Sequence, residues 1–230
     1  MRTPSEVLAA IQEQGILPMF SSSNETTCIN VLKALNHAGM KVIEFTNRCP
    51  EALHNFQQVK ATRDALFPDM LLGVGTIKTV DDVHKFIDAG ADFIVCPGMI
   101  PEVGKISVDT GLLWIPGCMT ATEIMIAEQT GAKLIKLFPG NLLTPSYIGA
   151  IKEIFPGLFF MPTGGVELDR DNMSAWYKAG ACAVGMGSKL VSKPLLENER
   201  YDTIEERGRQ ALAIIASYRK PEAVKENEQH

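Results

Sequence analysis

The strongest constraint in this chain is a regular alternation of short apolar runs with amphipathic helical segments. The apolar runs are rich in β-branched and large residues and show little alternation with polar ones. That pattern is typical of parallel strands buried on both faces. Eight runs predict eight strands: Ile16–Phe20, Lys41–Thr46, Met70–Val74, Asp92–Cys96, Leu112–Ile115, Lys133–Phe138, Leu158–Met161 and Cys182–Met186.

The segments between these runs carry apolar residues at helical spacing, which predicts helices with one apolar face. Thr120 and Glu123 have the spacing of a capping box, Thr79 with Asp82 resembles one, and Pro50 suits a first helical turn. The apolar positions are clearest at Cys28, Val31, Leu32 and Leu35; at Val83, Phe86 and Ile87; and at Met173, Trp176 and Tyr177.

Four glycines recur shortly before every second apolar run, at intervals of about two strand–helix units. They are Gly39, Gly90, Gly131 and Gly180. A glycine in this position suits the left-handed end of a helix that leads into a strand. The weak repeat therefore marks strands two, four, six and eight of one continuous series.

Eight strand–helix units predict an α/β fold, a small (β/α)₈ TIM barrel formed by a single domain over residues 1–219. An extra helix near Pro4–Glu13 precedes the barrel and another near Tyr201–Tyr218 follows it. The polar segment 220–230 is predicted to be a disordered tail. An open doubly wound sheet is the rival architecture. The sequences 73–75 and 185–187 lack the third glycine of a dinucleotide-binding loop, and no P-loop motif occurs, so the barrel is favoured.

Composition excludes several classes of protein. Hydrophobic residues make up 46% and charged residues 21% of the 230 residues, so the chain folds rather than staying disordered. A net charge of −5 argues against non-specific binding to nucleic acid or to an anionic membrane. No apolar run approaches the roughly 20 residues of a membrane span, and the N-terminus lacks a signal-peptide pattern. We expect a cytoplasmic protein whose partner is a small molecule.

The cysteines and histidines form no recognisable metal or redox motif. The five cysteines lie far apart and no pair has C-x-x-C spacing, which predicts reduced and mostly buried thiols. The four histidines do not cluster either. The sequence therefore predicts neither a metal nor a cofactor. The cysteines are Cys28, Cys49, Cys96, Cys118 and Cys182.

Two charged residues lie inside apolar strands: Glu44 in the second and Lys136 in the sixth. A buried charge costs several kcal/mol unless it is paired or neutralised. Two structural alternatives stay open: a stabilising ion pair, or a Lys136 side chain that points outwards. Alternate strands fill common layers of a barrel, so both residues can share one layer. Burial favours a neutral amine, which forms a Schiff base, and a nearby carboxyl supplies general acid–base catalysis.

Polar and turn residues gather at the predicted strand ends, where barrel active sites are built. Arg48 follows the second strand and suits a bidentate clamp on a substrate carboxylate, although a solvated loop charge is the alternative. The turn Thr163-Gly164-Gly165 and the pair Gly187-Ser188 follow strands seven and eight. Loops there commonly bind phosphate through backbone N–H groups, and a tight turn without a ligand is the alternative.

These motifs together resemble the 2-keto-3-deoxy-6-phosphogluconate / 4-hydroxy-2-oxoglutarate aldolases, from about residue 5 to residue 218. The resemblance rests on seven motifs in order: Glu44-x-Thr46-x-Arg48, Gly73-Val74-Gly75-Thr76, Pro97-Gly98, Ile115-Pro116-Gly117, Lys136-Leu137-Phe138-Pro139, Pro162-Thr163-Gly164-Gly165 and Gly187-Ser188. It implies a metal-free class I aldolase that cleaves a 2-keto-4-hydroxy acid to pyruvate and an aldehyde, and that assembles as a homotrimer.

The resemblance also implies roles for individual residues. Lys136 corresponds to the Schiff-base lysine and Glu44 to the general acid–base glutamate. Arg48 and Thr76 correspond to binders of the pyruvate carboxylate. The remaining implied substrate-binding positions are Pro97 and Thr163, and for the phosphate Gly164, Gly165, Gly187 and Ser188.

The chain departs from the common family pattern at three places. The residue before Arg48 is Asn47 rather than leucine, Leu137 replaces the first phenylalanine after the lysine, and the first strand ends without a basic residue. These changes bear on the aldehyde half of the substrate. Two other functions stay open: a different phosphate-binding barrel enzyme, such as an isomerase or a thiamine-phosphate-synthase-like transferase, and a non-catalytic barrel that binds a 2-keto acid.

Overall fold

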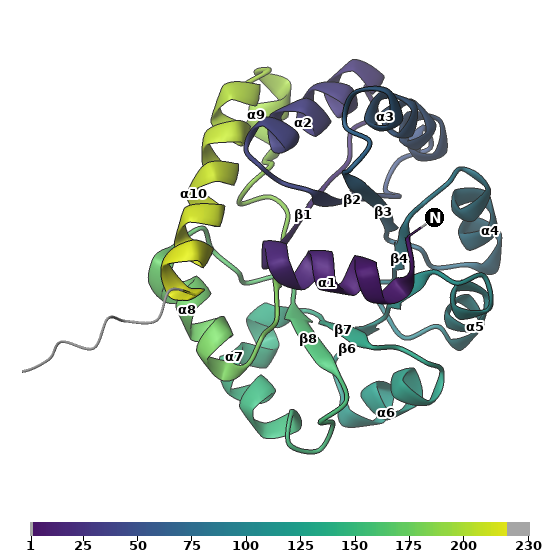
Figure 1. Ribbon diagram of the computed structural model, residues 1–230, viewed down its shortest axis with the longest axis vertical. Helices are drawn as coiled ribbons and strands as arrows, with labels where there is room; N and C mark the ends of the chain where they lie inside the picture. The colour runs from purple at the N-terminus through teal and green to yellow at the C-terminus, as the bar shows by residue number, and fades with distance from the viewer. Residues whose placement is uncertain (1, 220–230) are drawn as a thin grey trace, which may run out of the picture.

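The computed structural model describes residues 2–219, which form a ring of parallel strands surrounded by helices (Figure 1). The strands are β1 (Ile16–Phe20), β2 (Val42–Thr46), β3 (Leu71–Gly75), β4 (Phe93–Val95), β5 (Leu113–Ile115), β6 (Gly117–Cys118), β7 (Leu134–Leu137), β8 (Phe159–Pro162) and β9 (Val184–Met186). The predicted (β/α)₈ barrel is confirmed, with all eight strands near the positions that the apolar runs gave.

The helices alternate with the strands and add one at each end of the barrel. They are α1 (Pro4–Gln14), α2 (Glu25–His37), α3 (Ala52–Leu66), α4 (Val80–Asp88), α5 (Pro101–Asp109), α6 (Ala121–Gln129), α7 (Gly140–Ile151), α8 (Arg170–Ala179), α9 (Lys193–Glu197) and α10 (Tyr201–Arg219). The predicted extra helices correspond to α1 and α10. The tail predicted to be disordered, 220–230, lies outside the described residues.

The predicted fifth strand corresponds to β5, and an additional short strand that was not predicted, β6, follows it after Pro116. Proline has no N–H group to donate within a sheet, but its carbonyl oxygen still accepts a hydrogen bond from the Lys136 N–H at 2.9 Å. Strand pairing runs β5-β4-β3-β2-β1-β9 on one side of this break and β6-β7-β8 on the other. A parallel bridge between Thr163 and Gly185 joins β8 to β9 and closes the ring.

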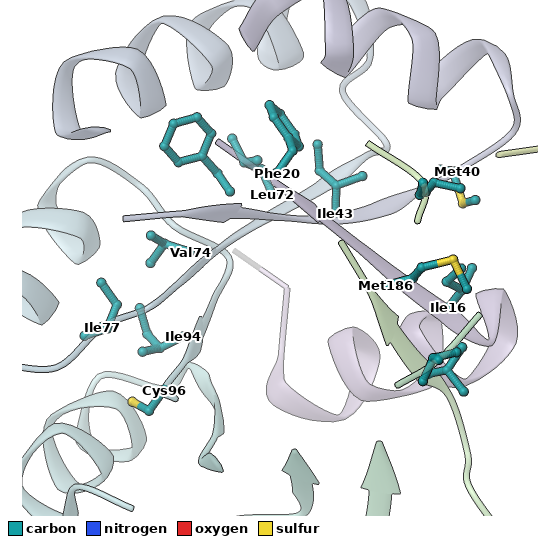
Figure 2. Packing of buried hydrophobic residues seen from close by; sticks show 14 of the residues in the cluster. Ile16, Phe20, Met40, Ile43, Leu72, Val74, Ile77, Ile94, Cys96 and Met186 are labelled. Carbon is teal, nitrogen blue, oxygen red and sulfur yellow. The ribbon is translucent and has the colours of Figure 1, made fainter. Parts of the chain in front are cut away.

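Neighbouring residues of each strand point to opposite sides of the barrel wall. Ile16 and Ile43 pack outwards against the helices, as Figure 2 shows for that cluster. Leu17 and Val42 belong instead to the cluster inside the ring. Both sides are apolar, which explains why the strand sequences show little alternation.

The helix α1 covers one end of the barrel (Figure 1). Its Val7 and Ile11 are buried in the inner cluster together with residues near the start of several strands, among them Leu17, Leu134 and Ala183. Thr3 and Glu6 form a capping box at its start. The amino-terminal end of the barrel is therefore plugged, and the other end remains for a binding site.

Asp92 was predicted to begin the fourth strand, but β4 begins at Phe93. The Asp92 carboxylate accepts hydrogen bonds from Arg63 Nη1 and from the Leu72 N–H, each at 2.8 Å. Arg63 is 5% exposed and also donates to the Met70 carbonyl. This buried pair therefore ties α3 to the starts of β3 and β4.

None of the helices in residues 2–219 combines the length and the apolar character that crossing a membrane requires.

We predict that Asp92→Ala lowers the free energy of unfolding by about 3 kcal/mol, because it removes the buried carboxylate that pairs with Arg63 Nη1 and leaves Arg63 only the half-exposed Asp64 carboxylate at Nε. Asp109→Ala is the matched control, since its ion pair with Lys105 is exposed and such pairs contribute little. Urea unfolding followed by circular dichroism measures both variants. Equal midpoints for the two variants would contradict the structural role of Asp92.

Candidate active site

Glu44 lies in the middle of β2 and points into the barrel, where its side chain is fully buried. Neither of its carboxyl oxygens has a hydrogen-bond partner among the described residues. Burial raises the pKa of this carboxyl, while the nearby charges of Lys136 and Arg48 act in the opposite direction. A buried carboxyl whose pKa is raised is a common property of catalytic sites.

Gly75 provides the space that Glu44 occupies. A Cβ atom at this position would lie 1.7 Å from Glu44 Oε1, so no other residue fits without moving the carboxyl group. Gly73, two residues earlier on β3, gives similar room to the Phe93 ring. The Gly-x-Gly sequence of β3 thus shapes the interior of the barrel.

Lys136 approaches Glu44 from the opposite wall of the barrel. Its Nζ atom lies 4.0 Å from Glu44 Oε1, and the residue is 4% exposed. The Phe138 ring lies beside it, with its centroid 5.6 Å from Nζ. Lys136 pairs with Gly117 of β6 and Met161 of β8, which fixes its height in the barrel. The two buried charges therefore meet in one layer, as the alternate-strand rule predicts.

This geometry decides between the structural alternatives. An outward-pointing Lys136 is wrong, because the amine lies inside the barrel near a fully buried carboxyl. A structural ion pair is disfavoured, because a satisfied buried pair needs hydrogen bonds on its remaining polar atoms and both Glu44 oxygens lack them. The amine and carboxyl instead lie close enough for one small molecule to contact both.

Arg48 and Thr76 lie at the carboxyl-terminal rim, after β2 and β3. Arg48 Nε donates a hydrogen bond to Thr76 Oγ1 at 3.3 Å. Thr76 has a φ of 63°, an unfavourable backbone conformation for a residue with a side chain, and such strain gathers at functional sites. The two residues line an open polar cavity of about 470 Å³ with Asn47, Cys49, Pro50, Lys78 and Asp82. This rim is suited to an anion.

The glycine turn after β8 and the end of β9 are neighbours on the same rim, because the Thr163–Gly185 bridge joins the two strands. Thr163 is 5% exposed and its hydroxyl has no partner among the described residues. Gly164 and Gly165 have φ values of 85° and 71°. Successive turn residues of this kind present backbone N–H groups to anions. Gly187 and Ser188 follow β9 directly.

Pro97 lies beside β6, the strand that pairs with the Lys136 strand β7. Its carbonyl oxygen would be 2.3 Å from a Cβ atom at Gly117, the residue paired with Lys136. All the predicted site residues therefore lie on strands or loops at the carboxyl-terminal half of the barrel. Lys136 and Glu44 contact each other at its centre, whereas Arg48 with Thr76 and the two glycine turns occupy separate parts of the rim.

Sequence reasoning missed three contributors to this site. The sequence did not reveal that Gly75 makes room for the Glu44 side chain, because a lone Gly-x-Gly has many explanations. The Phe138 contact depends on the position of Lys136, and Lys78 joins the rim cavity only through the loop after β3. In the described part of the chain, no three histidine, cysteine, aspartate or glutamate side chains gather to hold a metal ion.

Comparison with known proteins gives the same family that the sequence motifs resemble. The family profile Aldolase, described as KDPG and KHG aldolase, matches residues 7–207. The 2-dehydro-3-deoxy-6-phosphogalactonate aldolase of Escherichia coli is 31% identical over 81% of this chain and 85% of its own length. The 2-dehydro-3-deoxy-phosphogluconate aldolase of Haemophilus influenzae is 30% identical over 93% of this chain and 98% of its own.

A solved structure adds chemical information about a relative. The KDPG aldolase of Legionella pneumophila, with pyruvate captured as a covalent carbinolamine intermediate, is 27% identical to this chain. The match has a TM-score of 0.82 and covers 91% of this chain and 98% of that one. The chain is thus similar, over nearly its whole length, to an enzyme that bonds covalently to pyruvate.

We predict that Glu44 titrates above the ordinary glutamate value of 4.5 and that Lys136→Met raises its pKa further, because an attractive positive charge is lost. Arg48→Gln raises it less, since Arg48 has the weaker influence. Carbon NMR of ¹³C-labelled glutamate carboxyls measures this, and Glu44→Gln identifies the resonance. An unchanged or lower pKa of Glu44 in Lys136→Met would contradict the predicted attraction between the Lys136 charge and the Glu44 carboxylate.

Proposed function

The chain belongs to the KDPG and KHG aldolase family and is a class I aldolase, a carbon–carbon lyase, and we propose that it cleaves a 2-keto-3-deoxy-6-phospho sugar acid through a Schiff base on Lys136. The observation that carries the proposal is the buried pair of Lys136 Nζ and Glu44 Oε1, 4.0 Å apart. Pyruvate and glyceraldehyde 3-phosphate are the products of such a cleavage. Unphosphorylated 4-hydroxy-2-oxoglutarate is the second candidate substrate.

The first step begins when Lys136 passes a proton to the facing Glu44 carboxylate, and the freed amine attacks the C2 ketone. The nitrogen–carbon bond forms as the carbonyl π bond breaks, and a proton passes from the nitrogen to the oxygen, which gives a neutral carbinolamine. Glu44 then donates a proton to the carbinolamine hydroxyl so that water leaves and an iminium forms. The raised pKa of Glu44 suits this role, because it increases the protonated fraction of the carboxyl.

The second step breaks the C3–C4 bond. Glu44, now a carboxylate, accepts the proton of the C4 hydroxyl directly or through a water molecule. The electrons of the C3–C4 bond move into the iminium, the aldehyde leaves and an enamine of pyruvate remains. Protonation at C3 and hydrolysis release pyruvate and restore the amine. Covalent catalysis thereby replaces one difficult carbanion-forming step with easier ones.

Arg48 and Thr76 hold the substrate carboxylate at the rim and so direct C2 towards Lys136, which is a positioning effect. Their mutual hydrogen bond and the strained Thr76 backbone support this role. The phosphate binds at Gly164, Gly165, Gly187 and Ser188 through backbone N–H groups and the serine hydroxyl. Pro97, whose carbonyl lies beside Gly117, and Thr163, which bridges to Gly185, complete the proposed substrate contacts.

We further propose that the chain assembles as a homotrimer and works in the cytoplasm. Exposed apolar side chains near the barrel mouth support an assembly: Met119 is 40%, Phe138 39% and Leu142 64% exposed. Such a group of side chains is typical of a protein–protein interface. The five thiols support a reducing compartment. Light scattering on the full chain tests the trimer.

The decisive experiment is intact-mass measurement after incubation with pyruvate and borohydride. We predict one stable adduct per chain on Lys136, because borohydride reduces an iminium to a stable amine. Lys136→Met removes both the adduct and turnover. Pyruvate trapped elsewhere in this variant would contradict the assignment, and so would an unmodified wild-type chain, which a non-catalytic binding barrel or an unrelated phosphate-binding enzyme would give.

Glu44→Gln is the companion variant in this experiment. We expect turnover to fall by about 10²–10⁴-fold, the usual contribution of general acid–base catalysis, while the amine remains available for slow trapping. Wild-type turnover in this variant would remove Glu44 from the mechanism.

A separate prediction concerns the residues proposed to bind the phosphate. Ser188→Ala should raise KM for the phosphorylated substrate about tenfold or more, the effect of losing one hydrogen bond to a charged group. KM for 4-hydroxy-2-oxoglutarate should not change, because that substrate has no phosphate. Ser217→Ala on the outer helix α10 is the matched control. Equal effects of Ser188→Ala on both substrates would place the phosphate elsewhere.

A further inference from the structure

Two cysteines from different elements meet beside the rim that carries Arg48. Cys28 lies in α2 and is fully buried, and Cys49 lies in the loop between β2 and α3 and is partly exposed. Both thiols donate to the same backbone oxygen, that of Ser22: Cys28 Sγ at 3.3 Å and Cys49 Sγ at 3.6 Å. The two sulfur atoms therefore lie no further apart than the sum of these distances.

The shared acceptor does not depend on the thiols. Asn55 Nδ2 at the start of α3 also donates to the Ser22 oxygen, at 2.9 Å. A carbonyl oxygen has two lone pairs, so three donors exceed its capacity. The thiols are also weak donors. Loss of both thiol contacts therefore leaves no buried polar group unsatisfied, and the pair is free to react.

The loop that holds Cys49 also holds the carboxylate clamp. Cys49 directly follows Arg48, and only Asn47 and Arg48 separate it from the end of β2. Arg48 reaches Thr76 through a single side-chain hydrogen bond of 3.3 Å. A displacement of Cys49 therefore also displaces the adjoining backbone of Arg48, which carries the side chain that reaches Thr76.

We propose that Cys28 and Cys49 form a reversible disulfide in the presence of a hydroperoxide, and that this disulfide disables the Arg48 clamp. The consequence for catalysis rests on the proposed function, whereas the disulfide itself does not. Cys28 and Cys49 lie on the α2 and α3 side of the barrel, across from the α6 and α7 side (Figure 1). An assembly through Met119 and Leu142, beside α6 and on α7, leaves the partly exposed Cys49 uncovered.

The reaction balances with the peroxide as the oxidant. The thiolate sulfur of the partly exposed Cys49 attacks one peroxide oxygen, the O–O bond breaks, and hydroxide leaves to give a sulfenic acid. Cys28 sulfur then attacks the Cys49 sulfur, the S–O bond breaks, and the Cys28 proton leaves with the hydroxyl as water. Two thiols lose two electrons in total, and a thiol reductant reverses the change.

The surroundings keep the pair reduced until an oxidant is present. Burial raises the pKa of Cys28 to about 12, and burial together with Glu51 raises the pKa of Cys49. Both residues are therefore thiols rather than thiolates at neutral pH, which slows their oxidation. The disulfide is thus a response to sustained oxidant.

Peptide mapping of the full-length wild-type chain tests the disulfide without any substitution. After hydrogen peroxide treatment and alkylation of the remaining thiols, we expect a peptide that links Cys28 to Cys49, and we expect dithiothreitol to remove it. Cys182→Ser is the matched control, because it removes a partly exposed thiol elsewhere and keeps the link. No link, or a link between other cysteines, overturns the proposal.

The effect on catalysis is measured on the same samples. Peroxide should raise KM of the wild-type chain for the 2-keto acid about tenfold or more, by loss of a hydrogen bond to a charged group, and dithiothreitol should restore it. Cys28→Ser, compared before and after peroxide, should show no change. A link that leaves KM unchanged overturns the regulatory role. Pyruvate trapping on Lys136 without a link refutes this inference alone, whereas a link without trapping refutes the proposed function alone.

Discussion

A carboxyl group that is enclosed by the barrel wall and has no hydrogen-bonding partner within residues 2–219 is the feature on which the rest of this structure depends. Gly75 leaves the space that the Glu44 side chain fills, and Lys136 faces its carboxyl group at 4.0 Å. A buried charge without such a partner destabilises a fold by several kcal/mol. The same isolation raises the pKa of the carboxyl and makes it a useful acid and base. The burial that costs the fold stability is therefore also the cause of the raised Glu44 pKa.

The two ends of the barrel differ in their packing and in their polar groups. The amino-terminal end is filled by Val7 and Ile11 of α1 and is secured by the Arg63–Asp92 pair near the starts of β3 and β4. The carboxyl-terminal end carries glycine turns, a strained threonine and polar groups without partners. A rigid and well-packed base allows the opposite end to keep such unfavourable features, as barrel enzymes commonly do.

The rim residue Arg48 adjoins one of two thiols gathered at the Ser22 carbonyl. Arg48 Nε donates a hydrogen bond to Thr76 Oγ1, and the Arg48 backbone N–H donates to the Thr46 carbonyl. The proposed carboxylate-binding residue and one member of the proposed cysteine pair are therefore neighbours in one loop. A covalent change at Cys49 acts directly on the Arg48 backbone, because a planar peptide bond joins the two residues.

The sequence by itself determined the eight strands and the two buried charges, because apolar runs and an ionisable residue within them are local features. It also indicated the glycines that end several helices, and Gly39, Gly90, Gly131 and Gly180 all have positive φ values. Only the tertiary structure decided the 4.0 Å separation, the additional strand β6 and the role of Asp92 as a partner of Arg63. It alone brought three donors to the Ser22 carbonyl. The reason is physical: these contacts join residues far apart in the chain, so their distances follow from strand register and barrel closure and not from local sequence.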